Sequence, residues 1–417
     1  MEKAVELESA CIRRYVMKRR CVLMAMAALV SISFLFGGTF VCAEEVRGVT
    51  EDTIKIAILG DQTGPIAATW HGLREGFRTR IKYVNEQGGI NGRKIKIIVE
   101  DTRASIPMAL AAFKKIVFRD KVLCYWGPSS TSEFHALFPQ IEKEKMPTTS
   151  PSPTQKALIP FKRYAFIVCT LYSEQVKVMV DYLVNDMKVK NPRIAIVYAD
   201  NESGRNVLYA AREYAKHYNL NIVSEQVLNF GSIEASSQVL NLKRAKADYV
   251  FHLGTVGTSS ALLREARKLG YKAAFFDTMY GCDEDTVKMV GSAAKNFYGA
   301  HQFSPWHDKS PGMAELQKIT IGYDPGSKPR NRFYTQSWVV GMIFTEAMKR
   351  AGRNLNAETF VNSMESIKDF DTKGLCGLIS FGPKNHKALV YDRVYKADVE
   401  KKVMVPVTGW RKPLPIE

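Results

Sequence analysis

Apolar runs of strand length alternate with amphipathic segments of helix length from residue 54 onward. The predicted strands are residues 54–59, 94–100, 122–126, 164–169, 193–198, 221–227, 249–253, 273–276 and 296–301. The predicted helices between and after them are residues 70–87, 107–118, 133–145, 173–187, 203–217, 234–245, 258–269 and 283–293. This alternation is typical of α/β folds with parallel sheets covered by helices. Because the strands are too many for one modest sheet, we expect two doubly wound parallel-sheet lobes.

The last third of the chain has a different pattern. Residues 303–332 are rich in Pro, Gly and Lys. A long helix follows at residues 333–350, with Gly352 at its end, and a second helix at 357–366. The pattern then predicts a small antiparallel finish from residues 377–381, 389–397 and 402–406.

Two turns rich in hydroxyl groups follow neighbouring short strands near the middle of the chain. Gly127 and Pro128 stop the first strand, and four hydroxyl residues then crowd the start of a helix: Ser129, Ser130, Thr131 and Ser132. The second turn runs from Thr148 to Thr154. Free N–H groups at a helix N-terminus, supplemented by hydroxyls, suit a carboxylate or a phosphate. The alternative is that Ser130 or Ser132 only caps the helix.

Residues 1–43 have the pattern of a signal peptide. A basic stretch at 18–20 precedes an apolar run at 21–36, and small residues at 41–43 form a cleavage site. We therefore expect a mature chain that begins at Glu44 and is exported to the periplasm. Met17 is an alternative start to Met1, and an uncleaved membrane anchor is the alternative to cleavage.

The cysteines fit an exported protein without a cysteine metal site. Cys42 raises the question of lipid attachment, but Val41 occupies a position where such signals carry a smaller residue, so we favour a soluble form. No C-x-x-C motif is present, so zinc binding and thioredoxin-like chemistry have no support. Up to two disulfides could join the remaining cysteines, and their pairing stays open: Cys124, Cys169, Cys282 and Cys376.

Charge and motifs favour binding over catalysis. The formal net charge is +17, but the basic residues are scattered, whereas nucleic-acid-binding proteins cluster them. There is no nucleophile elbow, phosphate loop or zinc-helix motif, and Gly60 and Gly64 do not form a dinucleotide-binding pattern. We expect no catalytic residues, no metal, no cofactor and no nucleic-acid partner.

Several segments in order resemble the periplasmic substrate-binding proteins of ABC transporters, of the Leu/Ile/Val-binding type. The resemblance covers most of the mature chain and depends on order and spacing rather than on any one motif. It is carried by Ile54-Lys-Ile-Ala-Ile-Leu-Gly, Thr63-Gly-Pro, Tyr83-Val-Asn-Glu-Gln-Gly-Gly-Ile-Asn-Gly-Arg-Lys-Ile, Gly127-Pro-Ser-Ser-Thr, Ser150-Pro-Ser-Pro-Thr and Phe381-Gly-Pro-Lys-Asn-His.

The resemblance implies a type I periplasmic binding fold, with two lobes joined by three crossovers and a ligand clamped between them. Residues 44–168 and 303–386 would form lobe 1, and residues 169–302 and 387–417 would form lobe 2. The crossovers would fall near residues 169–171, 301–303 and 385–389. The long helix at 333–350 would then belong to lobe 1.

The resemblance also implies site residues. Thr131 would donate to a ligand carboxylate, with Ser129 and Ser130 beside it. Ser152 and Thr154 would meet the ligand head group, while Ser203 and Thr255 would contribute from lobe 2. Trp70 and Tyr280 are the aromatic candidates for the pocket, whereas Tyr125 and Trp126 fit the core as well as a pocket.

Tyr280 departs from the family pattern. It stands where amino-acid binders carry an acidic residue for the ligand's ammonium group, and a buried ammonium needs a negative partner. We therefore expect a small carboxylate that is not a simple aliphatic α-amino acid, with an aromatic or extended acid preferred. Asp277, Asp283 or Glu284 could supply the missing charge and keep the amino-acid interpretation open.

Three functions remain from the sequence. The first is the periplasmic solute-binding component of an ABC importer, a monomer whose partners are its ligand and the permease subunits in the inner membrane. The second is a sensory ligand-binding protein that signals to a membrane receptor. The third, and least favoured, is an exported α/β enzyme.

Overall fold

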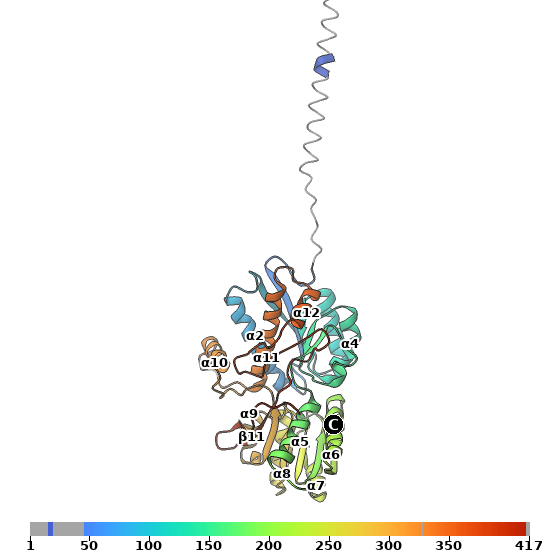
Figure 1. Cartoon of the computed structure of the whole chain (residues 1–417), viewed down its shortest axis with the longest axis vertical. Coiled ribbons are helices and arrows are strands. Elements are labelled where there is room, and N and C mark those ends of the chain that lie inside the picture. Colours follow the sequence, from blue (N-terminus) through green and yellow to red (C-terminus); the bar gives the residue numbers. More distant parts are fainter. Residues whose placement is uncertain (1–15, 20–45, 327, 414–417) are drawn as a thin grey trace, which may run out of the picture. The chain divides into compact units, whose positions relative to one another are not determined.

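Two sheets built mainly from parallel strands form the centres of two lobes (Figure 1). The computed structural model describes residues 16–19, 46–326 and 328–413. The predictions about cleavage near Ala43 and about the start site therefore fall outside the described residues. Among the described residues, no helix combines the length and apolar character needed to cross a bilayer.

Lobe 1 contains a five-stranded parallel sheet with strand order β2-β1-β3-β4-β5. Its strands are β1 (Thr53–Gly60), β2 (Lys94–Asp101), β3 (Cys124–Trp126), β4 (Thr148–Ser150) and β5 (Ala165–Ile167). Its helices are α2 (Ala67–Glu86), α3 (Ile106–Lys114), α4 (Thr131–Lys143), α10 (Pro311–Tyr323), α11 (Arg332–Ala351) and α12 (Ala357–Glu365), with short helical turns at Lys115–Arg119 and Gln155–Ala157. Strand β1 is buried because helices cover both faces of the sheet.

Lobe 2 contains a seven-stranded sheet with strand order β12-β11-β10-β9-β8-β6-β7. Its strands are β6 (Arg193–Tyr198), β7 (Asn221–Val227), β8 (Tyr249–His252), β9 (Ala274–Asp277), β10 (Phe297–His301), β11 (Arg393–Asp398) and β12 (Val403–Pro406). Strands β6 to β10 are parallel, and β11 and β12 add an antiparallel edge. The helices are α5 (Tyr172–Asp181), α6 (Glu202–His217), α7 (Ser236–Arg244), α8 (Val256–Lys268) and α9 (Glu284–Val290), with short turns at Tyr182–Asp186 and Gly291–Ala294.

Helix α11 packs against α2 in lobe 1, although nearly 250 residues separate them in the chain (Figure 1). Small residues allow the two backbones to approach closely. A Cβ atom on Gly76 would lie 2.1 Å from the carbonyl oxygen of Tyr334, and one on Gly72 would lie 2.5 Å from Asn331 Oδ1. The close approach brings the start of α11 near the cleft between the lobes.

The last third of the chain contains one helix that was not predicted and lacks one predicted strand. The segment at 303–332 contains α10, which begins with Pro311 directly after Ser310, a placement typical of a helix start. Residues 377–381 form no strand, because only one residue pair bridges there, Ile379 with Phe370. The antiparallel finish itself is present as β11 and β12.

The chain passes between the sheets after β5, after β10 and before β11. The first and third passages lie side by side, since Ile167 forms a bridge with Lys387. Asp392 is fully buried in the third passage and accepts a hydrogen bond from Thr170 in the first, at 3.0 Å. Burial raises the pKa of Asp392 to about 8. The exact lobe boundaries stay a prediction.

Gly76→Ala should lower the free energy of unfolding by about 1–3 kcal/mol, because the added methyl group forces α2 away from α11. Chemical denaturation of the purified protein measures the change. Gly322→Ala is the matched control: nothing lies within 4 Å of a Cβ there, and the residue is in α10. The control should unfold at the same or slightly higher denaturant concentration; equal loss in both variants would contradict the close packing.

Asp392 should make the protein less stable as pH rises from about 4 to 8. Its pKa is higher in the folded chain than the ordinary value of 3.8, so the folded state favours the proton and loses that advantage as the carboxyl ionises. Asp392→Asn should therefore flatten the decline, and melting temperatures at pH 5 and pH 8 measure it. Parallel pH profiles for the two proteins would contradict this assignment.

Candidate functional site

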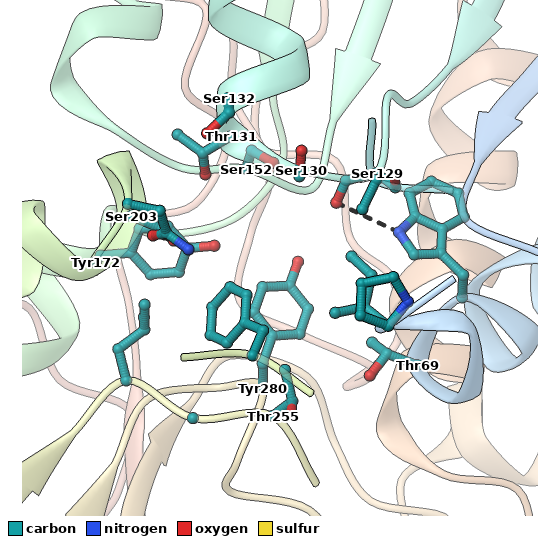
Figure 2. A pocket seen from close by; sticks show the side chains of 18 of the residues that line it. Thr69, Ser129, Ser130, Thr131, Ser132, Ser152, Tyr172, Ser203, Thr255 and Tyr280 are labelled. Atoms are coloured by element: carbon teal, nitrogen blue, oxygen red, sulfur yellow. Dashed lines mark hydrogen bonds between the residues drawn. The ribbon is translucent and has the colours of Figure 1, made fainter. Parts of the chain in front are cut away.

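A cavity of about 270 Å³ lies at the carboxyl ends of the parallel strands of both sheets (Figure 2). Lobe 1 lines it with Pro65, Ile66, Thr69, Trp70, Leu73, Ala104, Ser129, Ser130, Thr131, Ser132 and Ser152. Lobe 2 lines it with Tyr172, Asn201, Ser203, Phe230, Leu253, Gly254, Thr255 and Tyr280. Strand ends at such a crevice are the usual ligand sites of open α/β sheets.

All of the predicted site residues line this cavity except Thr154. Thr154 is buried, and its hydroxyl lies 2.8 Å from Nε2 of His135 in α4. Burial lowers the pKa of His135 to about 4, so the ring is neutral at pH 7 and Nε2 can accept the threonine proton. Tyr125 and Trp126 are buried in the core of lobe 1. The ligand-binding role of each lining residue stays a prediction.

No Asp, Glu, Lys, Arg or His is among the residues that line the cavity. The three acidic residues that could have replaced the missing charge have other partners. Asp277 accepts hydrogen bonds from Gly254 N at 3.0 Å and Ser259 Oγ at 2.6 Å. Glu284 Oε1 lies 2.7 Å from the Arg332 guanidinium, and Asp283 accepts from Arg332 N at 3.2 Å. The cavity wall therefore combines apolar and hydroxyl-bearing side chains and has no charged one.

The first turn of α4 forms one wall and carries a capping box. The Ser130 hydroxyl accepts from Glu133 N at 3.3 Å, and the Glu133 carboxyl accepts from Ser130 N at 2.6 Å. The same Glu133 oxygen also accepts from the Ser129 hydroxyl at 2.6 Å. Burial raises the pKa of Glu133, and these hydrogen bonds partly oppose that effect. Ser130 thus does cap the helix, as the alternative interpretation held, while also facing the cavity.

Trp70 presents its ring rather than a hydrogen-bond donor. Its indole Nε1 donates to the Ser129 carbonyl oxygen at 3.3 Å (Figure 2). Its ring lies against Gly60, where a Cβ would be only 2.2 Å from Trp70 Cε3. Because the indole N–H is already bonded, the ring can offer a ligand only apolar or stacking contact.

The lobe 2 wall comes from loops after β6, β7, β8 and β9. Asn201 caps α6 by accepting from Gly204 N at 3.0 Å, and it also accepts the Ser203 hydroxyl proton at 2.8 Å. The loop at Gly254 is held by Asp277, which also contacts His252 Nδ1 at 3.0 Å. Asn201 and Phe230 also line the cavity, but they were not among the predicted site residues. A cap signal before α6 could have found Asn201, but nothing in the local pattern pointed to Phe230.

Contacts across the cavity join the two lobes. The Tyr280 hydroxyl of lobe 2 donates to the Pro151 carbonyl oxygen of lobe 1 at 2.5 Å. Tyr172 of lobe 2 and Thr131 of lobe 1 line the same cavity. Further from the cavity, Asn331 Nδ2 donates to Asp285 Oδ2 at 3.1 Å. The described arrangement is therefore one in which the lobes contact each other around the site.

Among the described residues, no group of three or more His, Cys, Asp or Glu side chains could hold a metal ion. The four cysteines in this part of the chain are buried and free, so none of the disulfide pairings left open by the sequence is present there.

Comparison with known proteins gives consistent matches. A family model described as periplasmic binding protein matches residues 53–402. The Leu/Ile/Val-binding protein of Escherichia coli K12 is 28% identical over 263 residues, which is 63% of this chain and 70% of that protein. The leucine-specific-binding protein of Salmonella typhimurium is 29% identical over 252 residues, 60% of this chain and 67% of that protein.

Solved structures share the fold at lower identity. A branched chain amino acid ABC transporter protein from Thermus thermophilus with bound valine has a TM-score of 0.80 at 24% identity, covering 87% of this chain and 97% of that one. A fatty acid ABC transporter substrate-binding protein from Thermomonospora curvata has a TM-score of 0.78 at 20% identity, covering 88% and 95%. With the match over residues 53–402 and this two-lobed fold, the chain belongs to the periplasmic binding protein family, type I.

Proposed function

We propose that this protein is the periplasmic solute-binding component of an ABC importer, and that it clamps a small carboxylate-bearing ligand between its lobes. The observation that supports this most is the uncharged cavity, to which strand-end loops of both lobes contribute. Closure of the lobes around a ligand would create the surface that permease subunits recognise. The protein would bind its ligand as a monomer and leave it chemically unchanged.

The ligand carboxylate would lie at the first turn of α4. Ser130 N–H already donates to Glu133, but no hydrogen bond joins the backbone N–H of Thr131 or Ser132 to another described residue. These N–H groups lie at the positive end of the helix dipole, and the hydroxyls of Thr131 and Ser132 are beside them. Ser152 faces the same region from the β4 turn. The carboxylate can thus be bound without a cationic side chain.

The ligand would not be a simple aliphatic α-amino acid. An ammonium group in a closed cavity needs a negative partner, and no acidic side chain lines this one. Trp70 and Tyr280 provide ring surfaces for an aromatic or extended acid. Relatives named for branched-chain amino acids and a structural neighbour named for fatty acids both fit a carboxylate as the shared feature.

The export predictions belong to this proposal. A mature chain that begins near Glu44 would be released into the periplasm, the compartment for which the family is named.

A ligand should co-purify with protein isolated gently from its native host. Native mass spectrometry should show an added small molecule that is lost on denaturation, and its formula should contain a carboxylate. After the ligand is removed, small-angle scattering should show a larger radius of gyration, which falls when ligand is restored, because the lobes open and close as rigid bodies. Identical scattering profiles with and without a ligand of verified binding would contradict the clamp.

Thr131→Val should weaken binding of that ligand by about tenfold or more. The valine keeps the shape but loses a hydrogen bond to a charged group, worth about 1.5–3 kcal/mol. Calorimetric titration measures the affinity, and circular dichroism checks the fold. Thr154→Val is the matched comparison, since its hydroxyl bonds His135 outside the cavity lining and should change affinity much less. An equal loss in Thr154→Val would restore the predicted role of Thr154, and unchanged affinity in Thr131→Val would remove Thr131 from the site.

A further inference from the structure

The Ser129 hydroxyl has no proton to offer a ligand. A hydroxyl carries one proton, and Ser129 Oγ donates it to Glu133 Oε2 at 2.6 Å. An ionised carboxylate can only accept, so the hydroxyl is the donor in this bond, and the backbone N–H of Ser130 donates to the same Oε2 atom at 2.6 Å. Ser129 therefore faces the cavity with lone pairs alone.

Glu133 is held in this position by its surroundings. It is fully buried, it belongs to the capping box of α4, and its other oxygen, Oε1, has no partner among the described residues. The Thr102 hydroxyl lies 3.0 Å from Ser129 Oγ and supports the same turn from lobe 1. Glu133 does not line the cavity, so it acts on a ligand only through Ser129 and Ser130 and is a positioning residue.

The Tyr280 hydroxyl also has no proton to offer a ligand. It donates its single proton to the Pro151 carbonyl oxygen at 2.5 Å, across the cavity from its own lobe. Figure 2 shows the Tyr280 hydroxyl directed toward the turn that carries Ser129 and Ser130. Two hydroxyls from opposite lobes thus accept but do not donate, whereas the Thr131–Ser132 turn offers free N–H donors.

We propose that the ligand carries, next to its carboxylate, a neutral hydrogen-bond donor, a hydroxyl or an amide N–H, whose proton Ser129 accepts, with the Tyr280 hydroxyl as a second acceptor for a ligand that has a further proton. This inference rests on the proposed function and specifies the ligand class of the same site. A carbonyl or ether oxygen placed there would face lone pairs without a proton between them. An ammonium would bring a positive charge to a wall that holds no carboxylate.

The donor lies close to the ligand's carboxylate. Ser129 and Thr131 are two residues apart in one turn, so their Cα atoms are at most about 7 Å apart, and we place the donor near the ligand's carboxylate rather than at its far end. A set of acids that differ only at the carbon next to the carboxylate therefore tests the proposal. Mandelate has a hydroxyl there, benzoylformate a carbonyl oxygen, phenylacetate only hydrogen and phenylglycine an ammonium.

Calorimetric titration of ligand-free protein with these four acids should rank mandelate first. Its affinity should exceed that of phenylacetate by about three- to tenfold, as expected for one neutral hydrogen bond. Benzoylformate should bind no better than phenylacetate. Phenylglycine binding most tightly, mandelate merely matching phenylacetate, or none of the four binding would each overturn the inference.

Variants separate hydrogen-bond direction from a structural role. Ser129→Ala should remove the advantage of mandelate over phenylacetate. Ser237→Ala on the exposed side of α7 is the matched control and should keep that advantage. Glu133→Ala frees the Ser129 proton for donation to a ligand, so the affinity for benzoylformate should rise relative to the affinity for mandelate. A purely structural role of Glu133 would instead weaken all the acids by the same factor and contradict the assignment, provided that circular dichroism shows a folded protein.

The co-purified ligand separates this inference from the proposed function. A carboxylate with a neighbouring hydroxyl or amide N–H supports both. A carboxylate with no such donor, or with only an ammonium, overturns the inference and leaves the importer function standing. A ligand without a carboxylate overturns the proposed function itself.

Discussion

The hydrogen bond from the Tyr280 hydroxyl to the Pro151 carbonyl oxygen connects the lobes directly across the cavity. It joins the loop after β9 to the turn after β4, which are both strand ends facing the cleft. With this bond in place, Tyr280 occupies part of the site, presents a ring to the ligand and has no proton left to give. The ligand must therefore fit a site in which some hydroxyl groups can act only as hydrogen-bond acceptors.

Glu133 extends this constraint to lobe 1. A helix N-terminus that faces a cleft would ordinarily offer all of its first N–H groups to an anion. In α4 the protein's own carboxylate takes the Ser130 N–H and the Ser129 proton, and it leaves Thr131 and Ser132 for the ligand. The start of α4 thus supplies an acceptor, the Ser129 hydroxyl, beside donors, the N–H groups of Thr131 and Ser132. This arrangement favours one orientation of the ligand, although no charged residue lines the cavity.

The sequence predicted the fold well because its strongest signal was periodicity. Alternating apolar runs located the two parallel sheets, and motif order located the turns that line the cavity. The pattern failed where tertiary contacts decide the structure. Phe230 lines the cavity from the loop after the edge strand β7, and residues 377–381 lack a partner strand. The Ser130–Glu133 spacing was a readable capping-box signal, but only the folded turn shows that Ser129 shares the same carboxylate.

A crystal structure of the protein with its co-purified ligand tests the central claim most directly. The account predicts the ligand carboxylate at the N–H groups of Thr131 and Ser132, and a hydroxyl or amide N–H of the ligand within about 3 Å of Ser129 Oγ. It also predicts that Glu133 keeps its bonds to Ser129 and Ser130. A ligand ammonium in contact with Glu133, or a carbonyl oxygen of the ligand bonded to Ser129, would contradict it.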